Sequence, residues 1–215
     1  MSNNLVEYDQ GVTCLNMMQT SPPGFNSLAS LPRTVISARY GTDDNFTKEV
    51  LPGYAQDLWL VEEAALALKA AAEELLDGPF GFVVWDGYRP RRATLAMIEW
   101  ARKTGQMWLV EEGYIARRSR HNGGAAVDLS LIVWDTQELL DMGTEWDVFE
   151  ETSHVFNAQG SVLQNRLLLR DLMTRHGWVG YEKEWWHFEL KNARSFPLRD
   201  IPYDKEASPE DPSIC

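Results

Sequence analysis

Two histidines in the chain have neighbours that suggest chemistry rather than simple packing. His121 precedes a pair of glycines, Gly123 and Gly124, which allow another group to approach the backbone closely. His187 follows two tryptophans, and the acid Glu184 stands three residues before it. Each histidine is therefore a polar residue in a segment with features of a binding site.

Asp128 completes a candidate set of metal ligands. From residue 126 the sequence alternates as a strand does, so that Asp128 shares a face with Ala126 and Ser130, opposite to apolar residues. An acid on such a strand is costly to bury unless it is paired or coordinated. Two histidines and a carboxylate would hold zinc and leave its fourth position open. Glu184 is then a candidate base for a water at that position.

The spacing of these residues leaves a second interpretation open, namely a satisfied core histidine and a buried ion pair without a metal. The other two histidines carry weaker signals. His176 ends an expected helix just before Gly177, where a cation favours the helix dipole, and we expect a structural role for it. His154 lies in a long loop, residues 141–161, and either supports a nearby site or is an ordinary polar loop residue.

The composition restricts the class of protein and its partners. The chain has 215 residues, nine of them tryptophan, and a formal net charge of −12, as expected for one folded domain rather than a disordered chain. An acidic chain repels phosphate backbones and anionic lipids, so nucleic acid and membranes are not expected partners. The longest apolar runs in the sequence are well below the roughly 20 residues that span a bilayer.

The two ends of the sequence indicate where in the cell the protein is expected and whether its cysteines are expected to pair. No Lys or Arg precedes Arg33, and no apolar segment typical of a secretory signal follows Met1, so we expect a cytoplasmic protein. Cys14 and Cys215 form no short-spaced metal or redox motif. Two unpaired thiols are expected, with a disulfide between the ends as the alternative.

The predicted strands and helices that carry the candidate site residues follow one another in no regular order. Apolar and β-branched segments predict strands at residues 34–40, 80–85, 126–134, 178–181 and 185–190. Apolar side chains three and four residues apart predict helices at 57–76, where Asp57 would be the cap, 90–101 and 162–176. Without regular strand–helix–strand alternation the expected class is α+β. We expect one domain over residues 1–215, with an irregular lead-in at 1–32 and an acidic tail at 200–215.

Several separated motifs together resemble one protein family. The pattern Ser119-x-His121-x-x-Gly124-x-Ala126-x-Asp128, followed by Glu184-Trp185-Trp186-His187, is closely similar to that of the VanX-type D-alanyl-D-alanine dipeptidases. These are zinc D,D-peptidases that share a fold with the hedgehog signalling domain. Further family landmarks occur in the family's order, at Tyr40, residues 44–47, 85–90 and 142–143, Asp147 and residues 153–154. The resemblance covers roughly residues 34–190.

The resemblance implies a fold, a cofactor and catalytic roles. The fold would be a central, mostly antiparallel sheet with flanking helices, and each chain would bind one Zn²⁺ ion. By position, the zinc ligands would be His121, Asp128 and His187. Glu184 would be the general base, and Arg89 would stabilise the oxyanion as the tetrahedral intermediate forms.

The resemblance also implies a substrate, the dipeptide D-Ala-D-Ala, which would be hydrolysed to two D-alanines. Asp147 and Tyr40 would bind its free amino end, and Ser119 would lie on the substrate side of the zinc motif. Arg120 departs from the family pattern, in which a small polar residue is expected, and would either point into solvent or reach the substrate carboxylate.

Two other functions remain as alternatives to a dipeptidase. A peptidoglycan D,D-carboxypeptidase or endopeptidase of the same family would act on longer cell-wall peptides. A non-catalytic zinc-binding module is disfavoured, because binding alone requires neither a base such as Glu184 nor an oxyanion donor such as Arg89.

Overall fold

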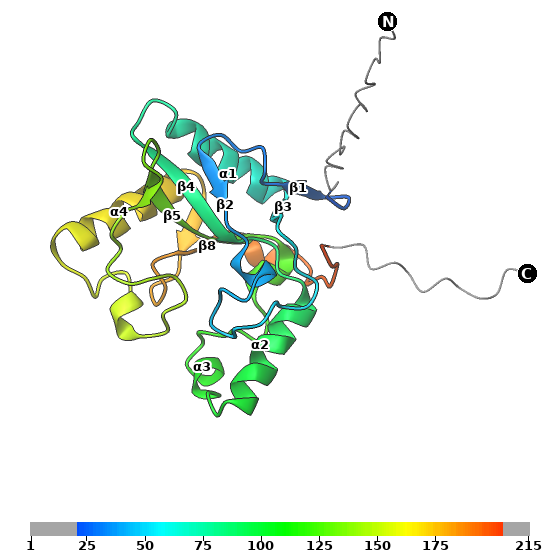
Figure 1. The fold of residues 1–215 in the computed structure, drawn as a ribbon. Coiled ribbons are helices and arrows are strands. Elements are labelled where there is room, and N and C mark those ends of the chain that lie inside the picture. Colours follow the sequence, from blue (N-terminus) through cyan, green and yellow to red (C-terminus); the bar gives the residue numbers. More distant parts are fainter. Residues whose placement is uncertain (1–20, 204–215) are drawn as a thin grey trace, which may run out of the picture.

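Within residues 21–203, which a computed structural model describes, a mixed sheet forms the centre of the molecule (Figure 1). Its strands run in the order β2 (Thr34–Ile36), β4 (Phe80–Asp86), β5 (Ala126–Val133), β8 (His187–Leu190) and β7 (Trp178–Gly180), and β6 (Glu138–Leu139) also pairs with β5. β2 is parallel to β4, and every other pair in this sheet is antiparallel. The expected α+β class and mostly antiparallel sheet are confirmed.

Helices flank this sheet. α1 (Glu62–Glu74) and α4 (Gly160–Arg175) contact each other, and α4 also packs against β7. α2 (Arg91–Lys103) and α3 (Trp108–Glu111) lie together below the sheet in the view of Figure 1. The short 3₁₀ helices are η1 (Arg39–Gly41), η2 (Arg120–Gly123), η3 (Glu151–Ser153) and η4 (Ala193–Ser195). Among the helices of residues 21–203, none combines the length and apolar character needed to cross a membrane.

Three neighbouring strands bring polar residues of the sequence to one place. Asp86 ends β4 and lies opposite Asp128 on β5, beyond an irregularity in the ladder after Val84. Asp128 in turn lies opposite His187, the first residue of β8. A break in a ladder turns the following side chain toward a new direction, which is common beside functional sites. The sheet therefore positions a group of ionisable side chains at this end of β4.

On β4 and β5, apolar residues that pack in the core alternate with residues that face the opposite side of the sheet. Leu129 and Leu131 of β5 face Val84 and Phe82 of β4 across the ladder, and all four side chains are fully buried. Because side chains of a strand alternate between two faces, the burial of this set leaves Asp128 on the other face. This agrees with the alternation predicted from the sequence.

The structure corrects the predicted start of the first helix. Residues 59–61 pair with β1 (Phe25–Ser27) as strand β3 (Trp59–Val61), so α1 begins at Glu62 rather than at residue 57. Asp57 is not its cap. The Asp57 carboxylate instead accepts hydrogen bonds from Ser27 Oγ and from the indole N–H of Trp59. The first residues of the predicted helix instead pair with β1 as a strand, and such pairing between distant segments leaves no sign in the local helical spacing.

Other boundaries also differ from the prediction. The strand expected at 34–40 ends at Ile36 and is followed by η1, and the strand expected from residue 185 begins at His187 after a turn. The lead-in expected to be irregular contains β1. Cys14, Cys215 and most of the expected acidic tail lie outside the described residues, and their pairing stays a prediction.

Candidate active site

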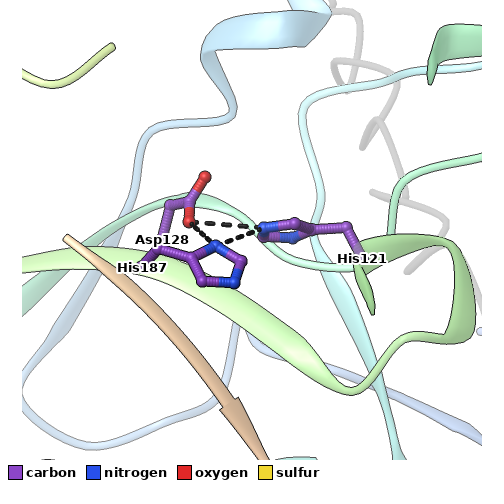
Figure 2. A group of neighbouring side chains, drawn as sticks. All are labelled: His121, Asp128 and His187. Carbon is purple, nitrogen blue, oxygen red and sulfur yellow. Dashed lines mark hydrogen bonds and ion pairs between the residues drawn. The ribbon is translucent and has the colours of Figure 1, made fainter. Parts of the chain in front are cut away.

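Three side chains that are distant in the sequence meet between β5 and β8 (Figure 2). Nε2 of His121 lies 3.1 Å from Nδ1 of His187 and 3.3 Å from Oδ1 of Asp128. The same oxygen of Asp128 lies 3.0 Å from Nδ1 of His187. Two adjacent strands supply Asp128 and His187, and η2 supplies His121. The structure thus brings together the three ligands predicted from the sequence.

The separations of these donor atoms fit a tetrahedral zinc ion. Nitrogen and oxygen ligands bound to zinc at about 2.0–2.1 Å are about 3.3 Å apart at the tetrahedral angle. The three donor atoms observed are 3.0 to 3.3 Å apart. Burial opposes the charge of Asp128, but the two histidines outweigh it and lower the pKa of Asp128, so the carboxylate is in the form that a metal requires.

The surrounding backbone fixes the ring of His121. Its Nδ1 donates a hydrogen bond to the Gly87 carbonyl at 2.7 Å, so that in the neutral ring Nε2 carries no proton and can bind a metal. Ser119 Oγ accepts a hydrogen bond from the His121 N–H at the start of η2. Gly124 ends η2 with a φ of 72°, and a Cβ at this position would lie 2.6 Å from the Phe25 ring. Glycine is therefore required at position 124.

Glu184 lies beside the three donors. Its Oε2 is 4.0 Å from Nδ1 of His187, and the residue is 8% exposed. A turn holds it in place, because the Glu184 N–H bonds to the Tyr181 carbonyl and the His187 N–H to the Glu184 carbonyl. Burial, and then the negative charges of Asp128 and Asp147, raise the pKa of Glu184 well above its ordinary value. A raised pKa makes this carboxyl group a stronger base, which suits it to accept a proton from water.

Arg89 is the buried cation of the site. Its Nε and Nη2 donate to Oδ2 of Asp86 at 3.0 and 2.6 Å, and its guanidinium lies 5.0 Å from the centre of the Tyr40 ring. Burial opposes the charge, but Asp86 raises the pKa of Arg89, so the guanidinium stays protonated. Asp86 was not among the residues predicted from the sequence. Its signal was available, because it is an acid at the end of a continuous apolar run.

Asp147 and Tyr40 form a pair at another wall of the same site. The Tyr40 hydroxyl donates to Oδ2 of Asp147 at 2.7 Å. The surroundings of Asp147 have a low dielectric constant, which raises its pKa to about 8 against the effect of the Tyr40 hydrogen bond. Asp147 has a φ of 60°, a left-handed conformation that aspartate tolerates better than most residues.

One cavity of about 400 Å³ is lined by every site residue predicted from the sequence: Tyr40, Arg89, Ser119, His121, Asp128, Asp147, Glu184 and His187. Three aromatic residues, Phe46, Tyr114 and Phe149, also line this cavity. Phe46 belongs to the family landmark at residues 44–47, although no role was predicted for it, whereas Tyr114 and Phe149 were not singled out. Tyr114 and Phe149 come from irregular segments, so neither a periodic pattern nor a short motif marked them.

The remaining two histidines have identifiable partners. His154 lies within hydrogen-bonding distance of the Tyr114 hydroxyl, at 3.0 Å, and so supports a residue of the cavity wall. His176 bonds to Glu74 at 2.7 Å, and Glu74 belongs to α1. The structural role expected for His176 agrees with this contact between α4 and α1.

An open metal position with a proton acceptor and a fixed cation beside it is the arrangement of a metal-dependent hydrolase. The comparison with known proteins is more specific. The model of the peptidase M15 family, described as D-ala-D-ala dipeptidase, matches residues 25–207, and the chain belongs to this family.

Curated relatives agree with this membership. The D-alanyl-D-alanine dipeptidase of Enterococcus faecium is 36% identical over 183 residues, which cover 77% of this chain and 86% of the relative. The enzyme of the same name from Streptomyces coelicolor is 35% identical, with coverage of 78% and 89%. That from Escherichia coli K12 is 36% identical, with coverage of 78% and 84%. The similarity therefore extends over most of each relative.

Proposed function

We propose that this protein is a zinc-dependent dipeptidase that hydrolyses D-alanyl-D-alanine to two D-alanines. The observation that carries the proposal is the enclosure, in one cavity, of the three metal donors, the buried carboxyl of Glu184 and the buried guanidinium of Arg89. The names of the curated relatives support D-alanyl-D-alanine as the substrate.

Each side chain has a task that follows from its position. Zinc, when held by His121, Asp128 and His187, lowers the pKa of water toward neutrality and polarises a carbonyl. Glu184 takes up the proton of the attacking water at a carboxyl oxygen and delivers it to the leaving amine. Arg89 presents a fixed positive charge to the oxygen on which negative charge develops. Because Asp86 holds the guanidinium already, little reorganisation is needed during the reaction.

The end of the cavity that Asp147 and Tyr40 line favours a dipeptide as the substrate over a longer peptide. In its ionised form Asp147 supplies a negative charge for a free ammonium group, and Tyr40 orients its carboxylate. The loop predicted at residues 141–161 contributes Asp147 and Phe149 to the cavity wall. A wall on the amine side favours a dipeptidase over a peptidoglycan D,D-carboxypeptidase or endopeptidase, which would have to admit a longer chain there.

The direct test measures D-alanine release from D-Ala-D-Ala, from its N-acetyl derivative and from L-Ala-L-Ala, before and after treatment with a chelator. We expect release from D-Ala-D-Ala alone, its loss with the chelator and its return with Zn²⁺. His187→Ala is expected to reduce the zinc content and abolish turnover. Turnover that persists without metal, or no turnover after zinc is restored, would refute the proposal.

A further inference from the structure

A free dipeptide carries a carboxylate as well as an ammonium group, and the proposed function, on which this inference rests, provides a partner for the ammonium group alone. Arg89 does not fill this need, because Asp86 binds it through two nitrogens and Tyr40 covers it on the amine side. A carboxylate in a partly enclosed site requires a cation or several N–H donors. The partner for the substrate carboxylate must therefore lie on the side of the metal donors that is opposite to Arg89 and Tyr40.

The order of the strands defines that opposite side. Arg89, with Tyr40 beside it, is attached to the end of β4, whereas Asp128 lies on β5 and His187 on the following strand, β8. Glu189 is two residues beyond His187 on β8 and thus shares its face, about 7 Å further along the strand. Glu189 also lines the cavity. The cavity therefore runs from the amine side at β4, across the metal donors, to Glu189 on β8.

Arg120 is the cation at this far end. Its Nε lies 3.6 Å from Oε2 of Glu189, with the two side chains 26% and 32% exposed, and both residues line the cavity. The backbone of Arg120 belongs to η2, directly before the metal donor His121. Arg118 and Arg194, which also line the cavity, are more exposed to solvent. Arg120 is thus the cation that combines a fixed backbone with a place beside the metal donors.

The contact between Arg120 and Glu189 is weak enough to be replaced by a ligand. Ion pairs at partly exposed positions contribute little to stability. At 3.6 Å the contact is longer than the 2.7–2.9 Å typical of a charge-assisted hydrogen bond. Glu189 therefore holds the side chain of Arg120 near the cavity without occupying its guanidinium fully.

We infer that Arg120 binds the C-terminal carboxylate of the dipeptide and thereby determines specificity for a free C-terminus. A guanidinium presents two parallel N–H groups that match a carboxylate. With Asp147 at one end and Arg120 at the other, the cavity is complementary to a zwitterion two residues long. A peptide that continues past the second residue presents a neutral amide to Arg120 and loses the charge-assisted bond.

The test compares D-Ala-D-Ala with its C-terminal amide, D-alanyl-D-alaninamide, for the wild-type zinc enzyme and for Arg120→Ala. We expect the substitution to raise KM for D-Ala-D-Ala about 10- to 100-fold with little change in kcat. KM for the amide, already high, should change less than about threefold, since it has no carboxylate to lose. Arg120→Gln, which preserves more of the side chain, should behave like Arg120→Ala, and Arg120→Lys should recover part of the affinity.

Arg117→Ala is the matched control, because it removes the same charge three residues away from an exposed side chain outside the cavity lining. It should leave both KM values unchanged, and all variants should retain zinc. An equal rise in KM for acid and amide would overturn the inference, since Arg120 would then support the site and not the carboxylate. An unchanged KM for D-Ala-D-Ala would overturn it as well. If the wild-type enzyme released no D-alanine, the proposed function itself would be refuted.

Discussion

The hydroxyl of Tyr40 donates a hydrogen bond to Oδ2 of Asp147 at 2.7 Å, and this bond joins two segments that are 107 residues apart. Within residues 21–203, the side chain of Asp147 makes this one hydrogen bond. Asp147 has a left-handed backbone, and its surroundings raise its pKa to about 8. A carboxylate held under these conditions destabilises the folded protein but is well suited to bind an ammonium group.

Asp147→Asn is expected to stabilise the metal-free protein at neutral and alkaline pH. The pKa of Asp147 is about 8 in the folded protein, above the value of about 3.9 for an unfolded chain. Its contribution to stability is therefore fully present below pH 4 and is lost as the pH rises through 8. Asparagine does not ionise and avoids this loss. Urea unfolding should show a gain on the order of 1–3 kcal/mol at pH 8 and none at pH 4.

The same variant should lose activity, which separates this effect from general stabilisation. Without a negative charge at Asp147, KM for D-Ala-D-Ala should rise about 30-fold or more, while stability at pH 8 improves. A gain in stability of equal size at pH 4 and pH 8 would contradict the argument, because it would not depend on ionisation.

Glu184→Gln is expected to retain zinc and to lower kcat by about 10²–10⁴-fold. Glutamine has nearly the same shape, but its amide cannot take up the proton of the attacking water. Zinc content and D-alanine release should be measured on the same preparation. Glu182→Gln is a matched control, because Glu182 is exposed and outside the cavity lining. Near-normal turnover in Glu184→Gln would remove Glu184 from the proton-transfer step.

The sequence predicted the residues whose types are unusual for their surroundings. Asp128 stands on an apolar strand and His187 beside two tryptophans, and both proved to line the cavity with the other predicted residues. The main strands and helices were also predicted, since their apolar periodicity reflects the faces that the fold buries. Family motifs added Arg89 and Asp147, which have no periodic signal of their own.

What the sequence did not reveal depends on contacts between distant segments. The pairing of residues 25–27 with 59–61 is a tertiary event, so the expected helix start at Asp57 was wrong. Tyr114 reaches the cavity from an irregular segment and meets His154 from another loop. Neither contact leaves a local pattern, because each depends on where separate loops lie in the fold.

Asp86→Asn is expected to destabilise the protein by about 3–5 kcal/mol, since it leaves the buried guanidinium of Arg89 without its counterion. Urea unfolding with an unchanged m-value would measure the loss. Glu73→Gln breaks an exposed ion pair with Lys69 and should change stability by about 0.5 kcal/mol or less. Equal effects of the two substitutions would show that the Arg89–Asp86 pair is not a buried charge pair in solution.

Arg166→Met is expected to loosen the loop that carries Asp147. Arg166 is 1% exposed, and its nitrogens donate to three backbone carbonyls of this loop, those of Met142, Thr152 and His154, at 2.5 to 2.9 Å. Methionine fills a similar volume but leaves these carbonyls unsatisfied, which should cost about 2–4 kcal/mol. Because Asp147 lies between the anchored positions, KM for D-Ala-D-Ala should also rise.

Amide hydrogen exchange of residues 142–154 provides the measurement that separates loosening of this loop from global destabilisation. Exchange there should accelerate in Arg166→Met more than in the strands of the central sheet, because local opening no longer breaks the hydrogen bonds of Arg166. Arg175→Met removes a cation from the exposed end of the same helix, where it pairs with Glu74, and should leave exchange in the loop unchanged. Uniform acceleration across loop and sheet would instead assign Arg166 to the stability of the whole domain.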